Sequence, residues 1–220
     1  MKKTATRLLV MGAALMALTG CATRQAPQHD YSALRHSNPR SILVVMPANH
    51  SPDVKADTGV LAQMTVPLAE QGYYVFPVAL VDEMFKQNGL MNGDEIRSAP
   101  LKKVQEIFGA DAVLYLDVND YGSSYQVIGS ATKVSLDAKL VDARTGQQLW
   151  AGSAASVSKS GGGGGSLVGA LIAAAASQII DTVTDRGYEV AGIATTQLVQ
   201  HGSQGRLLYG PYHPKYQADR

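Results

Sequence analysis

The single cysteine of the chain, Cys21, is the residue whose sequence context most clearly points to a chemistry. An uncharged apolar run from Leu8 to Leu18 precedes it, and the small residue Gly20 stands directly before it. The head of the chain is basic through Lys2, Lys3 and Arg7. A charged head, a short apolar run and a small residue at the cut are typical of a secretory signal. The eleven-residue run is too short to span a bilayer, which takes about 20 residues. We therefore predict a signal peptide over residues 1–20, cleaved between Gly20 and Cys21.

The four residues from Leu18 to Cys21 resemble the lipobox of bacterial lipoproteins, in which the cysteine is acylated and becomes the mature N-terminus. This resemblance implies lipid attachment at Cys21 and no other cofactor. Ala22, rather than aspartate, follows the cysteine. In enterobacterial-type sorting an aspartate at this position retains a lipoprotein in the inner membrane, so its absence favours the outer membrane. The alternative is an uncleaved N-terminal anchor that contains a cysteine by chance.

The composition of the chain excludes several classes of protein. The whole chain carries 19 Lys and Arg against 18 Asp and Glu. Because three of the basic residues lie in the signal, the mature chain is slightly acidic and lacks the basic surface of a nucleic-acid-binding protein. One cysteine excludes an internal disulfide and a cysteine-based metal site. With 45% hydrophobic and 17% charged residues, the chain is expected to fold into a globular domain.

The remaining residues with catalytic potential form no recognised motif. The histidines are scattered and lack the close spacing of paired metal ligands; they are His29, His36, His50, His201 and His213. The chain contains no Gly-x-Ser-x-Gly, Ser-x-x-Lys or His-Glu-x-x-His sequence. We therefore predict neither a metal site nor an enzyme. An envelope hydrolase assembled from distant Ser, His and carboxylate side chains stays as an alternative.

The elements that follow the signal predict a tether and then a single domain. Residues 21–40 are polar, show no apolar periodicity and contain Pro27 and Pro39. They predict a flexible tether that spans roughly 25 Å as a coil and about 65 Å when extended. Residues 41–220 are long enough for one sizeable core, and we assign them to one domain.

The first part of this domain alternates strands with helices. Residues 41–46, 73–76 and 111–118 are rich in apolar and β-branched residues and predict strands; the first, whose apolar run from Ile42 to Met46 is unbroken, is expected to be covered on both faces. Helical spacing of apolar residues predicts helices over 54–71, 78–87 and 100–108. Pro67 is expected to end or bend the first of these helices. The resulting order is β-α-β-α-α-β.

The next part predicts an antiparallel β-meander. Apolar and polar residues alternate from Thr132 to Asp142, as a half-exposed strand requires. Asp142 to Gly146 forms a turn, and residues 147–158 return as the partner strand. We therefore predict an α/β fold, specifically a mixed-sheet α/β sandwich completed by C-terminal helices and an extended tail at residues 207–214.

A helix predicted over residues 167–183 carries a stripe of small residues at Gly169, Ala173 and Ser177. Such a stripe allows close approach of another helix, in a membrane or an oligomer, or tight packing on the domain's own sheet. The uncharged apolar part, residues 167–180, is shorter than a membrane span. Core packing, contact with another protein, including a second copy of the chain, and bilayer insertion all stay open.

Three further segments, together with the lipobox, resemble a family of Gram-negative lipoproteins typified by a meningococcal surface-antigen lipoprotein. They are the strand Gly109–Tyr115, the hairpin Leu140–Trp150 and the tail Leu208–Tyr212. The Asp-x-x-Thr-Gly-x-x-Leu-Trp hairpin also occurs in other periplasmic lipoproteins, including the curli-export channel lipoprotein. The resemblance implies a sandwich similar to the N-terminal domain of TolB, and no catalytic residues.

The resemblance also implies genes placed beside a homologue of the curli-export channel lipoprotein, and hence a part in an envelope complex. We therefore expect an outer-membrane lipoprotein, lying on the periplasmic or surface face, that serves as a non-enzymatic binding or assembly component in secretion or transport. The expected partners are the membrane, through the lipid, and other envelope proteins. The alternative is a pore-associated subunit that inserts residues 167–180.

Overall fold

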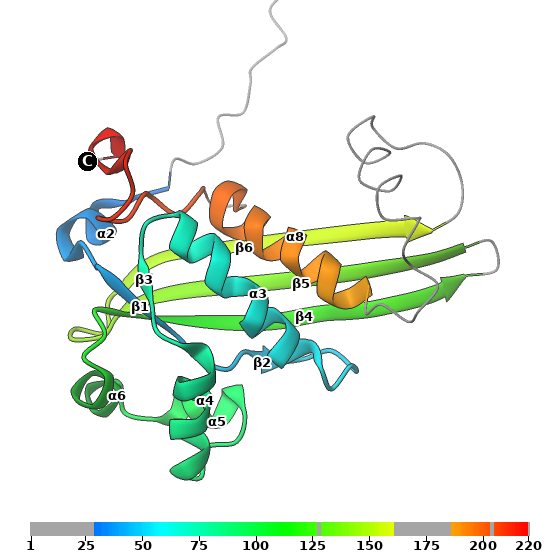
Figure 1. Ribbon diagram of the computed structural model, residues 1–220, viewed down its shortest axis with the longest axis horizontal. Coiled ribbons are helices and arrows are strands. Elements are labelled where there is room, and N and C mark those ends of the chain that lie inside the picture. The colour runs from blue at the N-terminus through cyan, green and yellow to red at the C-terminus, as the bar shows by residue number, and fades with distance from the viewer. Residues whose placement is uncertain (1–28, 127–128, 161–185, 203–204, 220) are drawn as a thin grey trace, which may run out of the picture.

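The computed structural model describes residues 29–126, 129–160, 186–202 and 205–219 (Figure 1). The first half contains the helices α2 (Ser32–Ser37), α3 (Ala56–Glu70), α4 (Val78–Gln87), α5 (Gly93–Ser98) and α6 (Leu101–Phe108), with the short strands β1 (Ser41–Val44), β2 (Ala48–Asn49) and β3 (Tyr74–Val75). The second half contains the long strands β4 (Ala112–Gln126), β5 (Gly129–Asp142) and β6 (Gln148–Ser160), the helix α8 (Arg186–His201) and the 3-10 turn η1 (Tyr216–Asp219).

One mixed sheet organises these elements. Its strands lie in the order β3-β1-β4-β5-β6, and β2 pairs with β4 beyond the end of β1. The pairs made by β1 and β2 are parallel, whereas β4, β5 and β6 form an antiparallel meander. The predicted mixed α/β fold and the meander are confirmed. The likeness to TolB stays a prediction.

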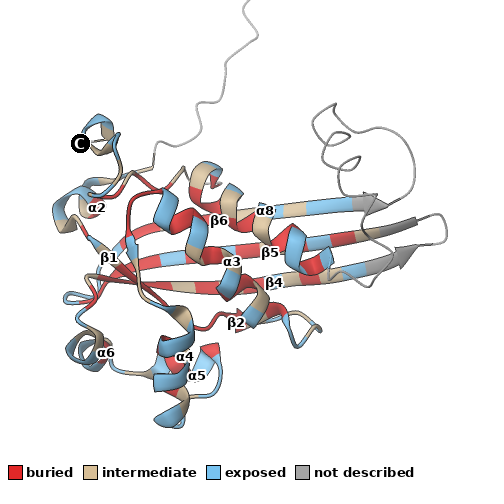
Figure 2. Ribbon diagram, viewed as in Figure 1, coloured by how far each residue is buried: buried red, intermediate tan, exposed pale blue. Residues whose placement is uncertain are grey.

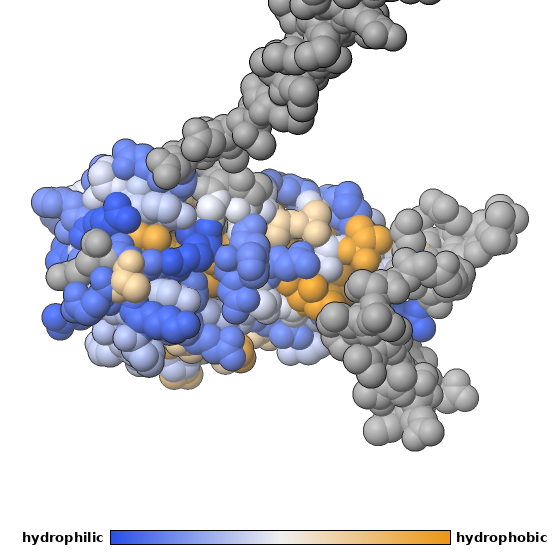
Figure 3. All heavy atoms as spheres, turned by 90° about the horizontal axis from the view of Figure 1, so that it is seen from above, coloured by the Kyte–Doolittle hydropathy of each residue, from blue (hydrophilic) through white to orange (hydrophobic). Residues whose placement is uncertain are grey.

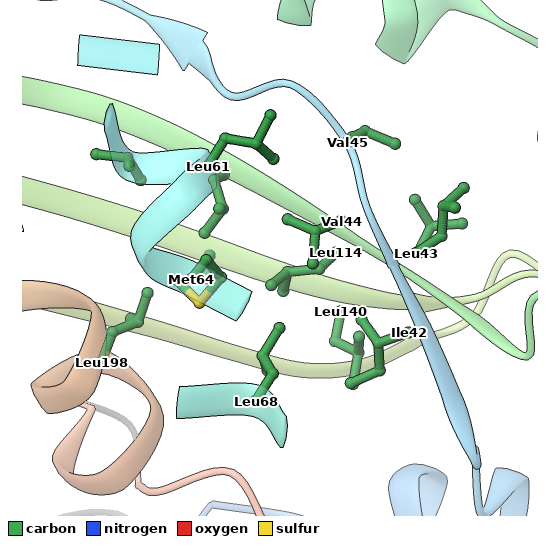
Figure 4. Close-up of a cluster of buried hydrophobic side chains, with 14 of the residues drawn as sticks. Ile42, Leu43, Val44, Val45, Leu61, Met64, Leu68, Leu114, Leu140 and Leu198 are labelled. Atoms are coloured by element: carbon green, nitrogen blue, oxygen red, sulfur yellow. The ribbon is translucent and has the colours of Figure 1, made fainter. Parts of the chain in front are cut away.

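The centre of the sheet is buried on both faces at β1. Ile42, Leu43, Val44 and Val45 are all essentially inaccessible to solvent. Figure 4 shows Ile42 and Val44 directed toward the α3 side of the sheet, while Leu43 and Val45 point the other way. The prediction that this strand is covered on both faces is confirmed. Its apolar run is unbroken because neither face of the strand meets solvent.

Two helical layers cover the sheet. Helices α3 and α8 lie side by side on one face, as their mutual contacts and Figure 1 show. The crossover from β1 to β3 and the crossover from β3 to β4 run in opposite directions across the sheet. Right-handed connections therefore place α4, α5 and α6 on the face opposite α3. Buried residues concentrate between these layers, and the outward sides of the helices are exposed (Figure 2).

The meander follows the predicted alternation. Val134, Leu136 and Leu140 are fully buried under the helices, while Lys133 and Asp137 on the other face are exposed. The strands are longer than predicted: β4 continues to Gln126, past a register shift between Val118 and Asp120. The polar residues of this extension follow no apolar pattern, because much of their pairing energy comes from the backbone of β5.

The predicted helices of the first half are confirmed within two residues at each end, and α4 has the predicted bounds. Pro67 lies inside α3, which continues to Glu70. Gly109 ends α6 in the left-handed conformation, with φ of 67°. The tail predicted to be extended at residues 207–214 has no regular structure up to Gly210 and then forms a turn from Pro211, but its start packs against the body. Gln71 Nε2 donates to the Leu207 carbonyl oxygen at 2.7 Å, and Tyr73 Oη donates to that of Leu208 at 2.8 Å.

The predicted tether was wrong over its second half. Residues 32–37 form α2, and Leu34 is only 3% exposed. Tyr31 Oη donates to the Arg206 carbonyl oxygen at 2.6 Å, which ties the start of the domain to its C-terminal tail. One buried leucine in a polar segment gives no periodicity, and its contacts come from residues far away in the sequence. The folded domain therefore begins at or before residue 30, and not at residue 41.

Replacing Leu34 with alanine tests this correction. Because the side chain is buried, Leu34→Ala should lower the free energy of unfolding by about 2–5 kcal/mol. Leu80→Ala is the matched control, since Leu80 is 65% exposed and should change stability by less than about 0.5 kcal/mol. Urea denaturation measures both. Equal, small effects of the two substitutions would return residues 30–40 to the tether.

Candidate functional site

The residues that the sequence singled out for chemistry or assembly lie outside the described residues. They are Gly20 and Cys21 at the cleavage site, and Gly169, Ala173 and Ser177 of the small-residue stripe. Their roles stay predictions.

Three histidines considered for an assembled active site lie in separate environments. His50 contacts Asp117, and the ring of His213 stacks on Tyr209 at 3.8 Å between centroids. His201 lies at the end of α8, beside β6. Within the described ranges, no serine hydroxyl is hydrogen-bonded to a histidine, and no group of three His, Cys, Asp or Glu side chains could hold a metal ion.

A polar cluster forms where α5 meets β4. Arg97 Nη1 lies 2.7 Å from Asp117 Oδ1, and its Nη2 donates to the Leu116 carbonyl oxygen at 2.7 Å. His50 Nε2 contacts the same Oδ1 at 3.2 Å. The Arg97 guanidinium also lies 5.9 Å from the centroid of the Tyr115 ring. The cluster borders an open hollow of about 290 Å³, whose wall is completed by Lys139 and Val141.

Local structure explains how these side chains meet. The amide of His50 donates to the Val118 carbonyl oxygen at 2.9 Å, which holds the end of β2 beside β4. Helix α5 begins at Gly93 and packs on the backbone of β2, where a Cβ atom would lie 2.4 Å from Ala48 N. Only glycine allows this approach, so Gly93 brings Arg97, one turn later, over β4.

The charges of this cluster hold α5 against the sheet and do not create a reactive centre; we call the Arg97–Asp117 ion pair the lock. Burial alone raises the pKa of Asp117, but hydrogen bonds from Arg97 and His50 outweigh burial and hold the pKa below its ordinary value. Asp117 is therefore a carboxylate at neutral pH and joins α5 to the sheet. Helix α5 was not predicted from the sequence. Its signal was Asn92 followed three residues later by Glu95, whose amide donates to the Asn92 side chain at 3.0 Å.

An apolar groove lies between α4 and α6. It encloses about 140 Å³, and Lys103 and Asn88 stand at its polar edges. The apolar stripes predicted for these two helices supply most of its wall, which consists of Met84, Phe85, Leu90, Ala99, Val104, Ile107 and Phe108. Met84 and Ile107 are exposed to solvent although both occupy helically spaced apolar positions of the predicted helices. The groove is large enough for an apolar side chain of another molecule.

None of the described helices is long and apolar enough to cross a membrane. This finding does not reach the predicted helix over residues 167–183, which is outside the described residues.

The fold and these surfaces define a mixed α/β domain that offers an apolar groove and an open sheet face. Comparison with known proteins places the chain in a family. Residues 29–212 match the family described as "Putative lipoprotein GNA1162-like". The chain belongs to this family, and the match begins beside α2, in agreement with the corrected domain boundary.

Two relatives from Neisseria meningitidis are similar over most of their length. The chain is 48% identical to "Putative lipoprotein NMB1124/NMB1162" of serogroup B over 204 residues, which cover 92% of this chain and 95% of the relative. It is 49% identical to lipoprotein GNA1162, whose crystal structure matches with a TM-score of 0.54 over 66% of this chain and 100% of that chain. These relatives confirm the family and the mixed α/β fold.

The lowered pKa of Asp117 predicts a dependence of stability on pH. A carboxyl whose folded-state pKa lies below its unfolded value of 3.8 stabilises the fold above that value and loses this contribution as the pH falls through the folded pKa. Asp117→Asn should therefore destabilise the protein at pH 7 and much less near pH 3. Denaturant unfolding at both pH values measures the difference, with exposed Asp94→Asn as a control. A deficit that is the same at pH 3 and pH 7 would contradict the lock.

Proposed function

We propose that this chain is an outer-membrane lipoprotein, anchored through acylated Cys21, whose domain binds other envelope proteins as a non-enzymatic component of a secretion or transport complex. The observation that carries the proposal is the match to a lipoprotein family over residues 29–212, directly after a lipobox-like sequence. Ala22 after the cysteine favours the outer membrane, and the scattered histidines favour a binding role over catalysis.

The corrected boundary makes the proposed anchor short. If Cys21 carries the lipid, residues 22–28 span at most about 24 Å before the domain begins. The side chain of His29 lies beside Gly205, on the side of the molecule where α2 and the C-terminal tail lie. Figure 1 places α4, α5 and α6 on the opposite side. A bilayer-held domain would therefore turn the apolar groove away from the membrane, toward other proteins.

The groove is the surface that we assign to a protein partner. Methionine side chains adapt to different partners, and Met84 lines this groove together with exposed Ile107. As partner we propose a homologue of the curli-export channel lipoprotein, which the family resemblance implies. Insertion of residues 167–180 into a bilayer or pore stays the alternative, and alkaline extraction of membranes holding the unlipidated chain would distinguish it.

Replacing Cys21 with alanine tests the anchor. Because the acylated cysteine is the proposed attachment, Cys21→Ala should abolish incorporation of labelled palmitate and release the protein from the outer-membrane fraction. Each buried CH₂ of the lipid is worth about 0.8 kcal/mol, so the parent protein should not dissociate measurably. A parent protein that takes up no palmitate, with a variant that still pellets with the outer membrane, would exclude the anchor.

A photoreactive amino acid at Met84 tests the groove in intact cells. We expect it to crosslink to the curli-export-channel-like lipoprotein, because Met84 lines the proposed docking surface. Adding Ile107→Glu, which places a charge on the groove, should remove this adduct. Lys133→Glu on the open sheet face is the control and should leave the adduct unchanged. An adduct that survives Ile107→Glu would place the contact elsewhere.

A further inference from the structure

Within the part of the chain that the structure describes, the outer edge of β6 has no backbone partner along most of its length. Strand β6 is the last strand of the sheet, and among the described residues it pairs only with β5. Near Trp150 its start is covered by α2 and the C-terminal tail, since Trp150 Nε1 donates to the Gly205 carbonyl oxygen at 3.2 Å. From Ala151 to Ser158 no described residue outside β5 donates to or accepts from its backbone.

This edge lacks the features that usually prevent strand pairing. Proteins commonly protect an edge strand with charged side chains, proline or a bulge. From Gln147 to Ser158 the chain has no charge and no proline, and most of its side chains are small. The one register shift of β6 lies near its start, between the partners of Leu140 and Val141, so the exposed part is regular.

Apolar residues flank the open edge above and below. On one side of the sheet Val157 is 52% exposed. On the other side α8 presents Ile193, which is 49% exposed, on the same helical row as Gln197 and His201. Gln197 and His201 line an open groove against Ser153, Ala154 and Ala155 of β6. Figure 3 views the molecule of Figure 1 from above. Hydrophobic residues, in orange, gather toward the right-hand end of the surface seen in this view.

We propose that this edge pairs with the same edge of a second copy of the chain. In an antiparallel arrangement with a two-fold axis near Ala155, each copy adds its β6 to the sheet of the other. Identical residues near the axis then face one another, and any charge there would meet a like charge. The uncharged run removes this obstacle, and Lys159 falls opposite Ala151 of the second copy. The result is one continuous sheet with α8 of both copies on the same face.

The second copy is the occupant that the charge pattern favours. A different protein could pair with a charged edge by offering the opposite charge, so only self-pairing requires an uncharged centre. The proposal does not depend on acylation of Cys21 or on the groove between α4 and α6. Failure of either of those proposals would leave it intact.

Thiol crosslinking of the full chain in cells tests the pairing. Cys21 is the only native cysteine. With Ala155→Cys, a short bis-maleimide should give a product with twice the mass of one chain, and mass spectrometry should find only this chain in it. Lys102→Cys, exposed on α6, and the parent chain are the controls and should give no crosslinked product. A signal at position 155 no stronger than in these controls, or an adduct with a different protein, would overturn the proposal.

A charge at the axis supplies the second test. Sedimentation of the purified full chain in detergent should give a dimer, and Ala155→Lys should give a monomer because two lysines would face each other. Ala155 is exposed, so the variant should keep the circular dichroism spectrum and unfolding midpoint of the parent. A monomeric parent, or a folded Ala155→Lys variant that stays dimeric, would contradict pairing through this edge.

Discussion

The parallel pairing of β1 with β4, from Ile42 with Ala112 to Val44 with Leu114, joins the two halves of the chain. Ile42, Leu43 and Val44 of β1 and their partners Ala112, Val113 and Leu114 of β4 are all essentially inaccessible to solvent. Each fully buried aliphatic residue contributes about 1.5–3 kcal/mol, so this short strand is a large share of the core. The groove between α4 and α6, the Arg97–Asp117 lock and the long meander all take their positions from it.

A second set of contacts closes the domain around this centre. Asp142, at the turn between β5 and β6, accepts from Ser37 Oγ at 2.6 Å and from the amides of Arg144 and Thr145 at 2.9 Å. These hydrogen bonds outweigh the effect of burial, which raises the pKa of Asp142, and hold that pKa below its ordinary value. The Asp-x-x-Thr-Gly hairpin that carries the family resemblance is thus explained by structure: it forms the turn and fastens α2.

Much of the fold could be predicted because its signals are local. The apolar run of β1, the period of two in β5 and the helical spacing of α4 each report burial directly. Segments whose order depends on distant contacts could not be predicted in this way. Tyr31 is held by Arg206, and α5 is held by the backbone of β2 and by Asp117. The two helices that form the groove could be predicted, but the groove itself could not. In the sequence, exposed Met84 and Ile107 cannot be told from core residues.

The proposed function depends on one proposed chemical event, the conversion of Cys21 into a lipidated N-terminus. The intact mass of the protein extracted from membranes tests it most directly. We expect a chain that begins at Cys21 and carries the added mass of a diacylglyceryl group and an amide-linked acyl chain. A chain that begins at Met1, or one that carries an unmodified cysteine, would contradict it.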